Sequence, residues 1–111
     1  MKLMFVVGAR PNFIKISPLI KAARHYGIRY SLTHTGQHYD DNMSKKFFEE
    51  LEIEEPDVSL NINSVSELFQ ISYIIKEFSI VCKSYKPDMV VVVGDVNSTM
   101  ACSIAVSRLD N

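Results

Sequence analysis

The first third of this sequence contains no acidic residue. All 13 Asp and Glu residues lie at Asp40 or later, while the stretch before it carries Arg10, Lys15, Lys21, Arg24 and Arg29. The net charge of the whole chain is only -1, which argues against general nucleic-acid binding, because that requires a basic surface. A solvated helix face explains Lys21, Arg24 and Arg29 as well as a ligand does. Arg10 and Lys15 differ, because they directly follow an apolar strand-like run.

Cysteines are few, and long apolar runs are absent. The two cysteines, Cys82 and Cys102, lack metal-ligand spacing and are expected to be small core residues, which fits a reducing cytoplasm. No run is long enough for a signal peptide or a membrane span. No cluster of His, Cys or carboxylate residues indicates a metal or redox cofactor. The sequence therefore predicts a cytoplasmic protein without cofactor, membrane or nucleic-acid partner.

The 111 residues are enough for one domain and contain no Gly/Ser-rich linker and no internal repeat. Apolar runs predict strands at 2–7, 29–35, 58–62 and 89–93. Helical patterns separate them and follow the last one. This alternation predicts a doubly wound α/β domain, with a parallel sheet between two helical layers.

The spacing of apolar residues predicts the buried face of each helix. For the helix that starts near Pro11 and stops at Gly27, the predicted face is Phe13, Ile16, Ile20 and Ala23, with a kink at Pro18. For a helix capped by Asp40 or Asp41, it is Met43, Phe47 and Leu51. For a long helix opened by a Ser64/Glu67 capping box, it is Leu68, Ile71, Ile75, Phe78, Cys82 and Tyr85. For a last helix capped by Asn97 or Ser98, it is Ala101, Ile104, Ala105 and Leu109.

Three polar segments follow predicted strands, namely Gly8–Lys15, Thr35–Tyr39 and Gly94–Thr99. In open parallel sheets, ligands bind at the carboxyl ends of the strands. A glycine, a helix N-terminus and two cations together predict a phosphate or diphosphate ligand for the first segment. The Gly-x-Gly-x-x-Gly turn of nicotinamide sites and the Gly-Lys-Ser/Thr of P-loops are both absent.

Asp95 stands between a strand-terminating glycine and a predicted helix start. A carboxylate there can hold a sugar hydroxyl or transfer a proton, or it can cap the turn. His38 is either a ligand contact or a polar loop residue. For His25 and His34 we expect structural or surface roles.

Three motifs together resemble one family. Gly8-Ala9-Arg10-Pro11-Asn12-Phe13-Ile14-Lys15-Ile16-Ser17-Pro18-Leu19, Thr35-Gly36-Gln37-His38 and Gly94-Asp95-Val96-Asn97-Ser98-Thr99 are similar to the N-terminal part of the non-hydrolysing UDP-N-acetylglucosamine 2-epimerases. The resemblance implies a glycosyltransferase type-B architecture, of which residues 1–111 would form an incomplete N-terminal Rossmann-like domain without the C-terminal nucleotide-binding domain. It also implies a UDP-sugar substrate, contacted by Arg10, Lys15 and His38, with Asp95 in substrate binding and acid–base chemistry.

The same resemblance limits the expected activity. The family's other acidic residues, its catalytic histidine and its uridine-binding residues would lie beyond Asn111, so we expect the chain to be inactive alone and the full-length enzyme to be a homodimer. The family's first motif more often has Thr and Glu where this chain has Ala9 and Asn12, a variant similar to relatives acting on diacetamido-uronic acid sugar nucleotides. The alternatives are therefore such an epimerase, a non-catalytic nucleotide or phosphate module, and a truncated chain with no independent role.

Overall fold

The protein is built on one parallel β-sheet. The computed structural model describes residues 1–8, 10–35, 45–60, 66–93 and 102–104. Within these residues the sheet has four strands, β1 (Lys2–Val7), β2 (Arg29–His34), β3 (Val58–Ser59) and β4 (Met89–Val92), which lie in the order β3-β2-β1-β4. All three pairings are parallel. The predicted α/β fold is therefore confirmed, although β2, β3 and β4 each end earlier than the apolar runs suggested.

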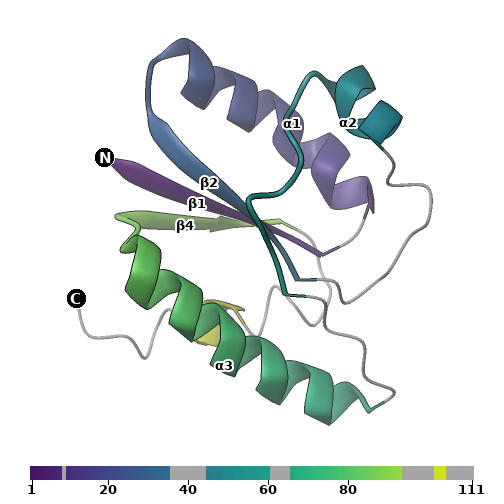
Figure 1. Ribbon diagram of the computed structural model, residues 1–111, viewed down its shortest axis with the longest axis vertical. Helices are drawn as coiled ribbons and strands as arrows, with labels where there is room; N and C mark the ends of the chain where they lie inside the picture. The colour runs from purple at the N-terminus through teal and green to yellow at the C-terminus, as the bar shows by residue number, and fades with distance from the viewer. Residues whose placement is uncertain (9, 36–44, 61–65, 94–101, 105–111) are drawn as a thin grey trace.

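The helices lie on both faces of the sheet. Helices α1 (Arg10–His25) and α2 (Lys45–Leu51) cover one face, and α3 (Glu67–Tyr85) covers the other (Figure 1). Each face has its own apolar core. On the α1 side the core centres on Phe5, Phe13 and Phe48, and on the α3 side it centres on Ile74 and Phe78. Strands with apolar residues on both faces need two such covering layers.

Helix α1 runs through Pro18 without interruption. Proline has no N–H, so the carbonyl of Ile14 loses the donor that a helix normally provides from four residues on. The hydroxyl of Ser17 donates to this carbonyl at 3.2 Å and takes over that role. The helix ends at His25, and Gly27 is the predicted stop just after it, with a φ of 69° in the left-handed conformation that glycine adopts without strain.

Helix α3 corrects two predictions. Its N-cap is Ser66, whose hydroxyl accepts from the Phe69 N–H, and Ser64 does not have this role. Ile74 is fully buried, whereas Leu68, predicted to be buried, is 75% exposed. Leu68 precedes Ile74 by six residues, which turns it about 120° away around the helix.

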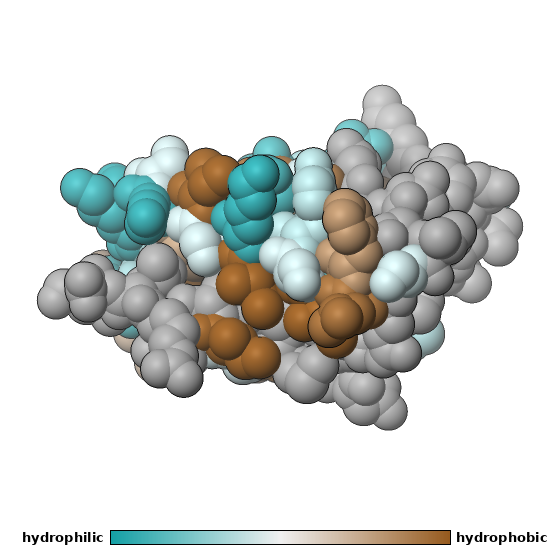
Figure 2. All heavy atoms as spheres, turned by 90° about the horizontal axis from the view of Figure 1, so that it is seen from below, coloured by the Kyte–Doolittle hydropathy of each residue, from teal (hydrophilic) through white to brown (hydrophobic). Residues whose placement is uncertain are grey.

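The outer side of α3 is partly apolar. Figure 2 looks onto this side of the molecule and shows apolar side chains, in brown, in the middle of the face. The exposed apolar residues of the helix are Leu68, Phe69, Tyr73 and Ile80. Within the described residues, no helix is long and apolar enough to cross a bilayer.

The last predicted helix is described only at residues 102–104. Cys102 is buried against the α3 side of the sheet, as predicted, but Ile104 is 40% exposed. Two residues along a helix correspond to a rotation of about 200°, so the two side chains cannot share a face. The Asn97/Ser98 cap and the rest of this predicted face lie outside the described residues.

The predicted face of the second helix is described in part. Phe47 is buried, as predicted. Met43 and the Asp40/Asp41 cap lie outside the described residues.

Two aspartates open strands in the same way. The Asp57 carboxylate accepts from the Leu32 N–H at 2.8 Å, and the Asp57 N–H donates to the Leu32 carbonyl at 2.9 Å. Asp88 makes the same pair of bonds with Lys2, at 2.7 Å and 2.8 Å. Each aspartate follows a proline. Both therefore fix the register of a strand against its neighbour at the first residue.

Replacing Asp57 by alanine should lower the free energy of unfolding by about 1–2 kcal/mol, because a partly buried N–H loses a charged acceptor. Chemical denaturation of Asp57→Ala tests this, with the exposed neighbour Glu55→Ala as the matched control. Equal stability of the two variants would show that the register is set without the carboxylate.

Candidate functional site

The strand order defines where a ligand would bind. From β1 the chain winds to β2 and β3 on one side, and then returns to β4 on the other side of β1. The winding direction therefore reverses between β1 and β4. In doubly wound sheets the binding crevice opens at this switch point, outside the carboxyl ends of the strands. Gly8 follows β1 there, and it is buried.

The backbone of the Gly8 residue is hydrogen-bonded by a side chain. Its N–H donates to Oδ1 of Asn12 at 3.2 Å, in a buried bond from the first turn of α1. His34, the last residue of β2, pairs in register with Val7 beside it, and a hydrogen bond to the Gly8 backbone influences the pKa of this histidine. Three elements, β1, α1 and β2, thus meet at one backbone residue.

His34 is almost completely enclosed. It is 9% exposed, and its ring packs against Phe13 with centroids 5.5 Å apart. Burial lowers the pKa of His34 below its ordinary value of 6.5, and the bond to the Gly8 backbone opposes part of that shift. Nε2 is buried without a hydrogen-bond partner. The imidazole is therefore neutral near pH 7.

The N-terminus of α1 has the charge that an anion requires. The helix begins at Arg10, and its first turn contains no acidic residue. Lys15 is exposed at the second turn. A cation near the positive end of a helix dipole is mildly unfavourable, and a bound anion would compensate for it.

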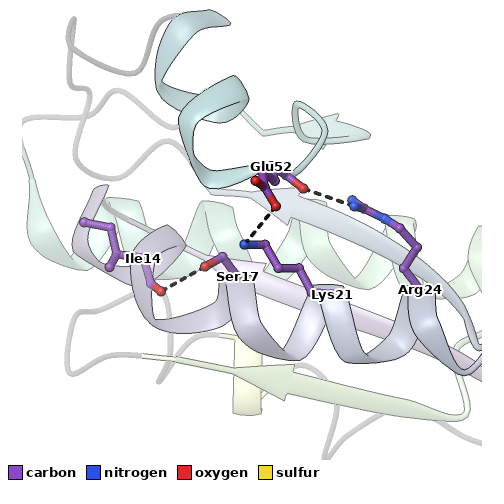
Figure 3. Close-up of polar contacts among 5 residues, drawn as sticks. All are labelled: Ile14, Ser17, Lys21, Arg24 and Glu52. Carbon is purple, nitrogen blue, oxygen red and sulfur yellow. Dashed lines mark hydrogen bonds and ion pairs between the residues drawn. The ribbon is translucent and has the colours of Figure 1, made fainter.

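The remaining cations of α1 have another role. Nζ of Lys21 lies 3.5 Å from the Glu52 carboxylate, and Nη1 of Arg24 donates to the Glu52 carbonyl at 3.1 Å (Figure 3). Both contacts are at the surface, where an ion pair contributes little to stability. Lys21 and Arg24 therefore join α1 to the end of α2. This fits a solvated helix face better than a ligand site.

Of the residues that the sequence predicted for the site, only part falls within the structure. Lys15 is exposed in the second turn of α1, and the helix begins at the backbone of Arg10. The side chain of Arg10, and both Asp95 and His38, lie outside the described residues. No group of three or more His, Cys, Asp or Glu residues among those described could hold a metal ion.

A profile of the family described as UDP-N-acetylglucosamine 2-epimerase matches residues 21–110. The chain belongs to this family. A UDP-N-acetylglucosamine 2-epimerase homolog of Methanococcus maripaludis is 46% identical over 110 residues, which cover 99% of this chain and 30% of the homolog. The UDP-2,3-diacetamido-2,3-dideoxy-D-glucuronate 2-epimerase of Pseudomonas aeruginosa is 41% identical, over 98% of this chain and 31% of that protein.

The fold agrees with the family. The crystal structure of the Methanocaldococcus jannaschii UDP-GlcNAc 2-epimerase, in complex with UDP-GlcNAc and UDP, matches with a TM-score of 0.89 and 42% identity. The match covers 97% of this chain and 30% of that one. This epimerase-family chain therefore spans about 30% of the length of the relatives it matches.

The contact between Asn12 and Gly8 is one that reasoning from the sequence does not predict, because the sequence singles out Asn12 only as a departure from the family's first motif. The structural role expected for His34 is confirmed by its burial against Phe13. One signal was available for Asn12, because it follows Gly8 by four residues, one helical turn into α1. No local signal connects His34 to Gly8, since their contact depends on the pairing of β2 with β1.

Proposed function

We propose that this chain forms one Rossmann-like domain of a UDP-N-acetylglucosamine 2-epimerase and that its β1–α1 turn binds the diphosphate of the UDP-sugar. The observation that carries the proposal is the 46% identity to the Methanococcus maripaludis homolog over 99% of the chain. The match to a structure holding UDP-GlcNAc and UDP supports the substrate class. The residues at the switch point agree with it, because a glycine, a helix N-terminus and Lys15 suit a diphosphate.

The reaction interconverts UDP-GlcNAc and UDP-ManNAc. The bond between C1 of the sugar and the diphosphate oxygen breaks, and the proton leaves C2, which gives UDP and a glycal-type intermediate. UDP then adds back to C1, and a proton returns to the opposite face of C2. Both electron pairs stay within the reacting molecules, so no redox cofactor is needed.

Each candidate residue has a role in this scheme. Arg10 and Lys15 would stabilise the negative charge that builds on the departing diphosphate, which is where electrostatic catalysis gains most. Asp95 would hold the sugar or transfer the proton at C2. His38 would contact the substrate. Because the chain spans about 30% of its relatives' length, the remaining catalytic groups would come from further chain, and residues 1–111 alone should not turn over. The complete enzyme would act as a cytoplasmic homodimer in polysaccharide biosynthesis.

A related substrate is the second candidate. The Pseudomonas aeruginosa relative acts, by its name, on UDP-2,3-diacetamido-2,3-dideoxy-D-glucuronate, and it is 41% identical to this chain. Ala9 and Asn12, in the first motif, are the positions that favour this alternative. Titration with each sugar nucleotide in parallel separates the two, since the tighter binder identifies the substrate class.

UDP binding tests the proposal directly. Arg10→Ala should weaken UDP binding roughly tenfold or more, because a charge-assisted contact to phosphate is lost. Lys21→Ala is the matched control, since Lys21 is an exposed cation of the same helix that pairs with Glu52. Isothermal titration calorimetry measures both. If both variants weaken UDP binding equally, the effect comes from the overall positive charge and not from a specific contact of Arg10. If the wild type does not bind UDP, the proposal is contradicted.

A proton NMR spectrum of UDP-GlcNAc with the chain in heavy water tests the chemistry. We expect no deuterium at C2 over hours, together with line broadening that Arg10→Ala removes. Exchange at C2 would show that the chain alone abstracts the proton, contrary to the expected inactivity. Neither exchange nor broadening would favour a chain without an independent role.

A further inference from the structure

We propose that Asn12 and His34 are positioning residues that together hold the Gly8 residue, and through it the β1–α1 turn, in the conformation that binds diphosphate. The inference rests on the proposed function, because it concerns the same turn. It assigns roles to two residues that lie beside the predicted ligand contacts.

The first observation is that the Gly8 backbone lies between two polar side chains. Its N–H donates to Oδ1 of Asn12 at 3.2 Å, and His34, opposite Val7 in the β1–β2 register, hydrogen-bonds the Gly8 backbone from the other strand. The parallel ladder continues one residue past β2, where the Thr35 N–H donates to the Val7 carbonyl at 3.0 Å. At Gly8, therefore, the backbone hydrogen bonds between strands give way to hydrogen bonds from side chains. Glycine alone would leave this residue many conformations, and the two side chains restrict them.

The second observation is that His34 has a cost that its bond to Gly8 can explain. The ring atom Nε2 of His34 is buried without a hydrogen-bond partner. Unsatisfied buried polar atoms are unfavourable, and an apolar side chain packed on Phe13 would avoid the penalty. What imidazole adds at this position is the hydrogen bond to the Gly8 backbone.

The third observation concerns the consequence for the ligand. Gly8 is separated from Arg10 by a single residue, and Asn12 lies in the first turn of α1. The Asn12 bond therefore fixes the angle at which the chain enters the helix whose N–H groups and cations would face the diphosphate. Binding groups held in place before the ligand arrives lose less entropy on binding, which raises affinity. Asn12 and His34 would thus act on affinity without touching the ligand.

Four variants test this. Asn12→Leu and His34→Leu remove the bonds to Gly8 at similar side-chain volume. His34→Asn keeps an N–H donor close to the position of Nδ1 and serves as the rescue. Thr33→Val is the matched control, because Thr33 is a fully buried polar residue of β2 that bonds Met4 and not Gly8.

Two measurements are made on each variant that folds: the affinity for UDP, and the exchange rate of the Gly8 amide proton by NMR. We expect Asn12→Leu to speed Gly8 exchange, and both leucine variants to weaken UDP binding roughly three- to tenfold. His34→Asn should restore most of the affinity, and Thr33→Val should change neither quantity by more than about twofold.

Leucine variants that bind UDP as tightly as Thr33→Val would overturn the inference. So would weaker binding with Gly8 exchange unchanged in Asn12→Leu. If the wild type fails to bind UDP, the proposed function fails, and the two side chains lose their role in binding with it. The Gly8 exchange rate still reports separately whether Asn12 holds the turn.

Discussion

Replacing Phe13 by alanine is expected to lower the free energy of unfolding by about 3–5 kcal/mol, the largest effect of any single change argued for this protein. Phe13 is fully buried in α1, and its ring contacts three others. The centroid distances are 5.2 Å to Phe48, 5.5 Å to His34 and 6.1 Å to Phe47. The residue thus joins α1 to α2 and to the end of β2.

The cost has two parts. Alanine removes most of the apolar surface that Phe13 buries, and it leaves a cavity that the neighbouring rings can fill only in part. The edge-to-face contacts with Phe47 and Phe48 are lost as well, each contributing about 0.5–1.5 kcal/mol beyond burial. The total free energy of unfolding of a small domain is about 5–15 kcal/mol, so a loss of this size should leave the variant close to unfolded.

Urea denaturation followed by far-ultraviolet circular dichroism measures the loss. Ile14→Ala is the matched control, because Ile14 is the next residue of α1 and is 51% exposed, so its loss should stay below about 1 kcal/mol. Where Phe13→Ala does not fold, Phe13→Leu leaves a smaller cavity and should still unfold at a lower urea concentration than the wild type. Equal midpoints for Phe13→Leu and Ile14→Ala would show that Phe13 is not central to the core.

The fold was largely predictable because its signals are local. A strand buried on both faces is an almost continuous apolar run, as 2–7 is. Residues 89–93 form such a run too, although β4 is only partly buried. Gly27 stops α1 by its own conformational freedom, wherever the helix packs. Reasoning of this kind gave the element order, the parallel sheet and the two helical layers.

The errors arose where a tertiary contact decides between equal local alternatives. Ser64 and Ser66 are both acceptable N-caps, and only the geometry of α3 selects Ser66. Leu68 fits the apolar spacing of α3 as well as Ile74 does, but the sheet covers only the side that carries Ile74. Local pattern cannot tell which apolar residues of a helix the sheet reaches.

The candidate site was predictable as a place but not as a set of contacts. The carboxyl end of β1 could be identified because a glycine and two cations follow an apolar run. The bond from His34 to Gly8 joins residues 26 positions apart, and it exists only because β2 pairs with β1 in one register. Asp95 and His38 stay predictions that rest on the family's motifs.

Raising the pH from about 8 to about 10 is expected to lower the free energy of unfolding by about 3 kcal/mol through two buried thiols. Burial raises the pKa of Cys82 from 9.0 to about 11. Burial, with the nearby Cys82 as a smaller cause, raises the pKa of Cys102 from 9.0 to about 12. Above pH 9.0 the unfolded chain therefore releases two protons that the folded chain retains, so stability falls as the pH rises. Near pH 10 each thiol contributes about 1.4 kcal/mol to this loss.

The slope of the free energy of unfolding against pH shows whether the two thiols cause this loss. Urea denaturation at intervals from about pH 8 to about pH 10 should give a slope that Cys102→Ala about halves and that Cys82→Ala/Cys102→Ala reduces to the smaller part from Tyr85, whose pKa burial also raises. The cavity cost of each alanine is nearly independent of pH, so it shifts the whole curve without changing its slope. Iodoacetamide provides a second readout, since it reacts with thiolates and should modify the folded chain far more slowly than the urea-unfolded chain. A slope unchanged in the double variant would assign the alkaline loss to other groups, and the thiols would then ionise in the folded chain as readily as in the unfolded one.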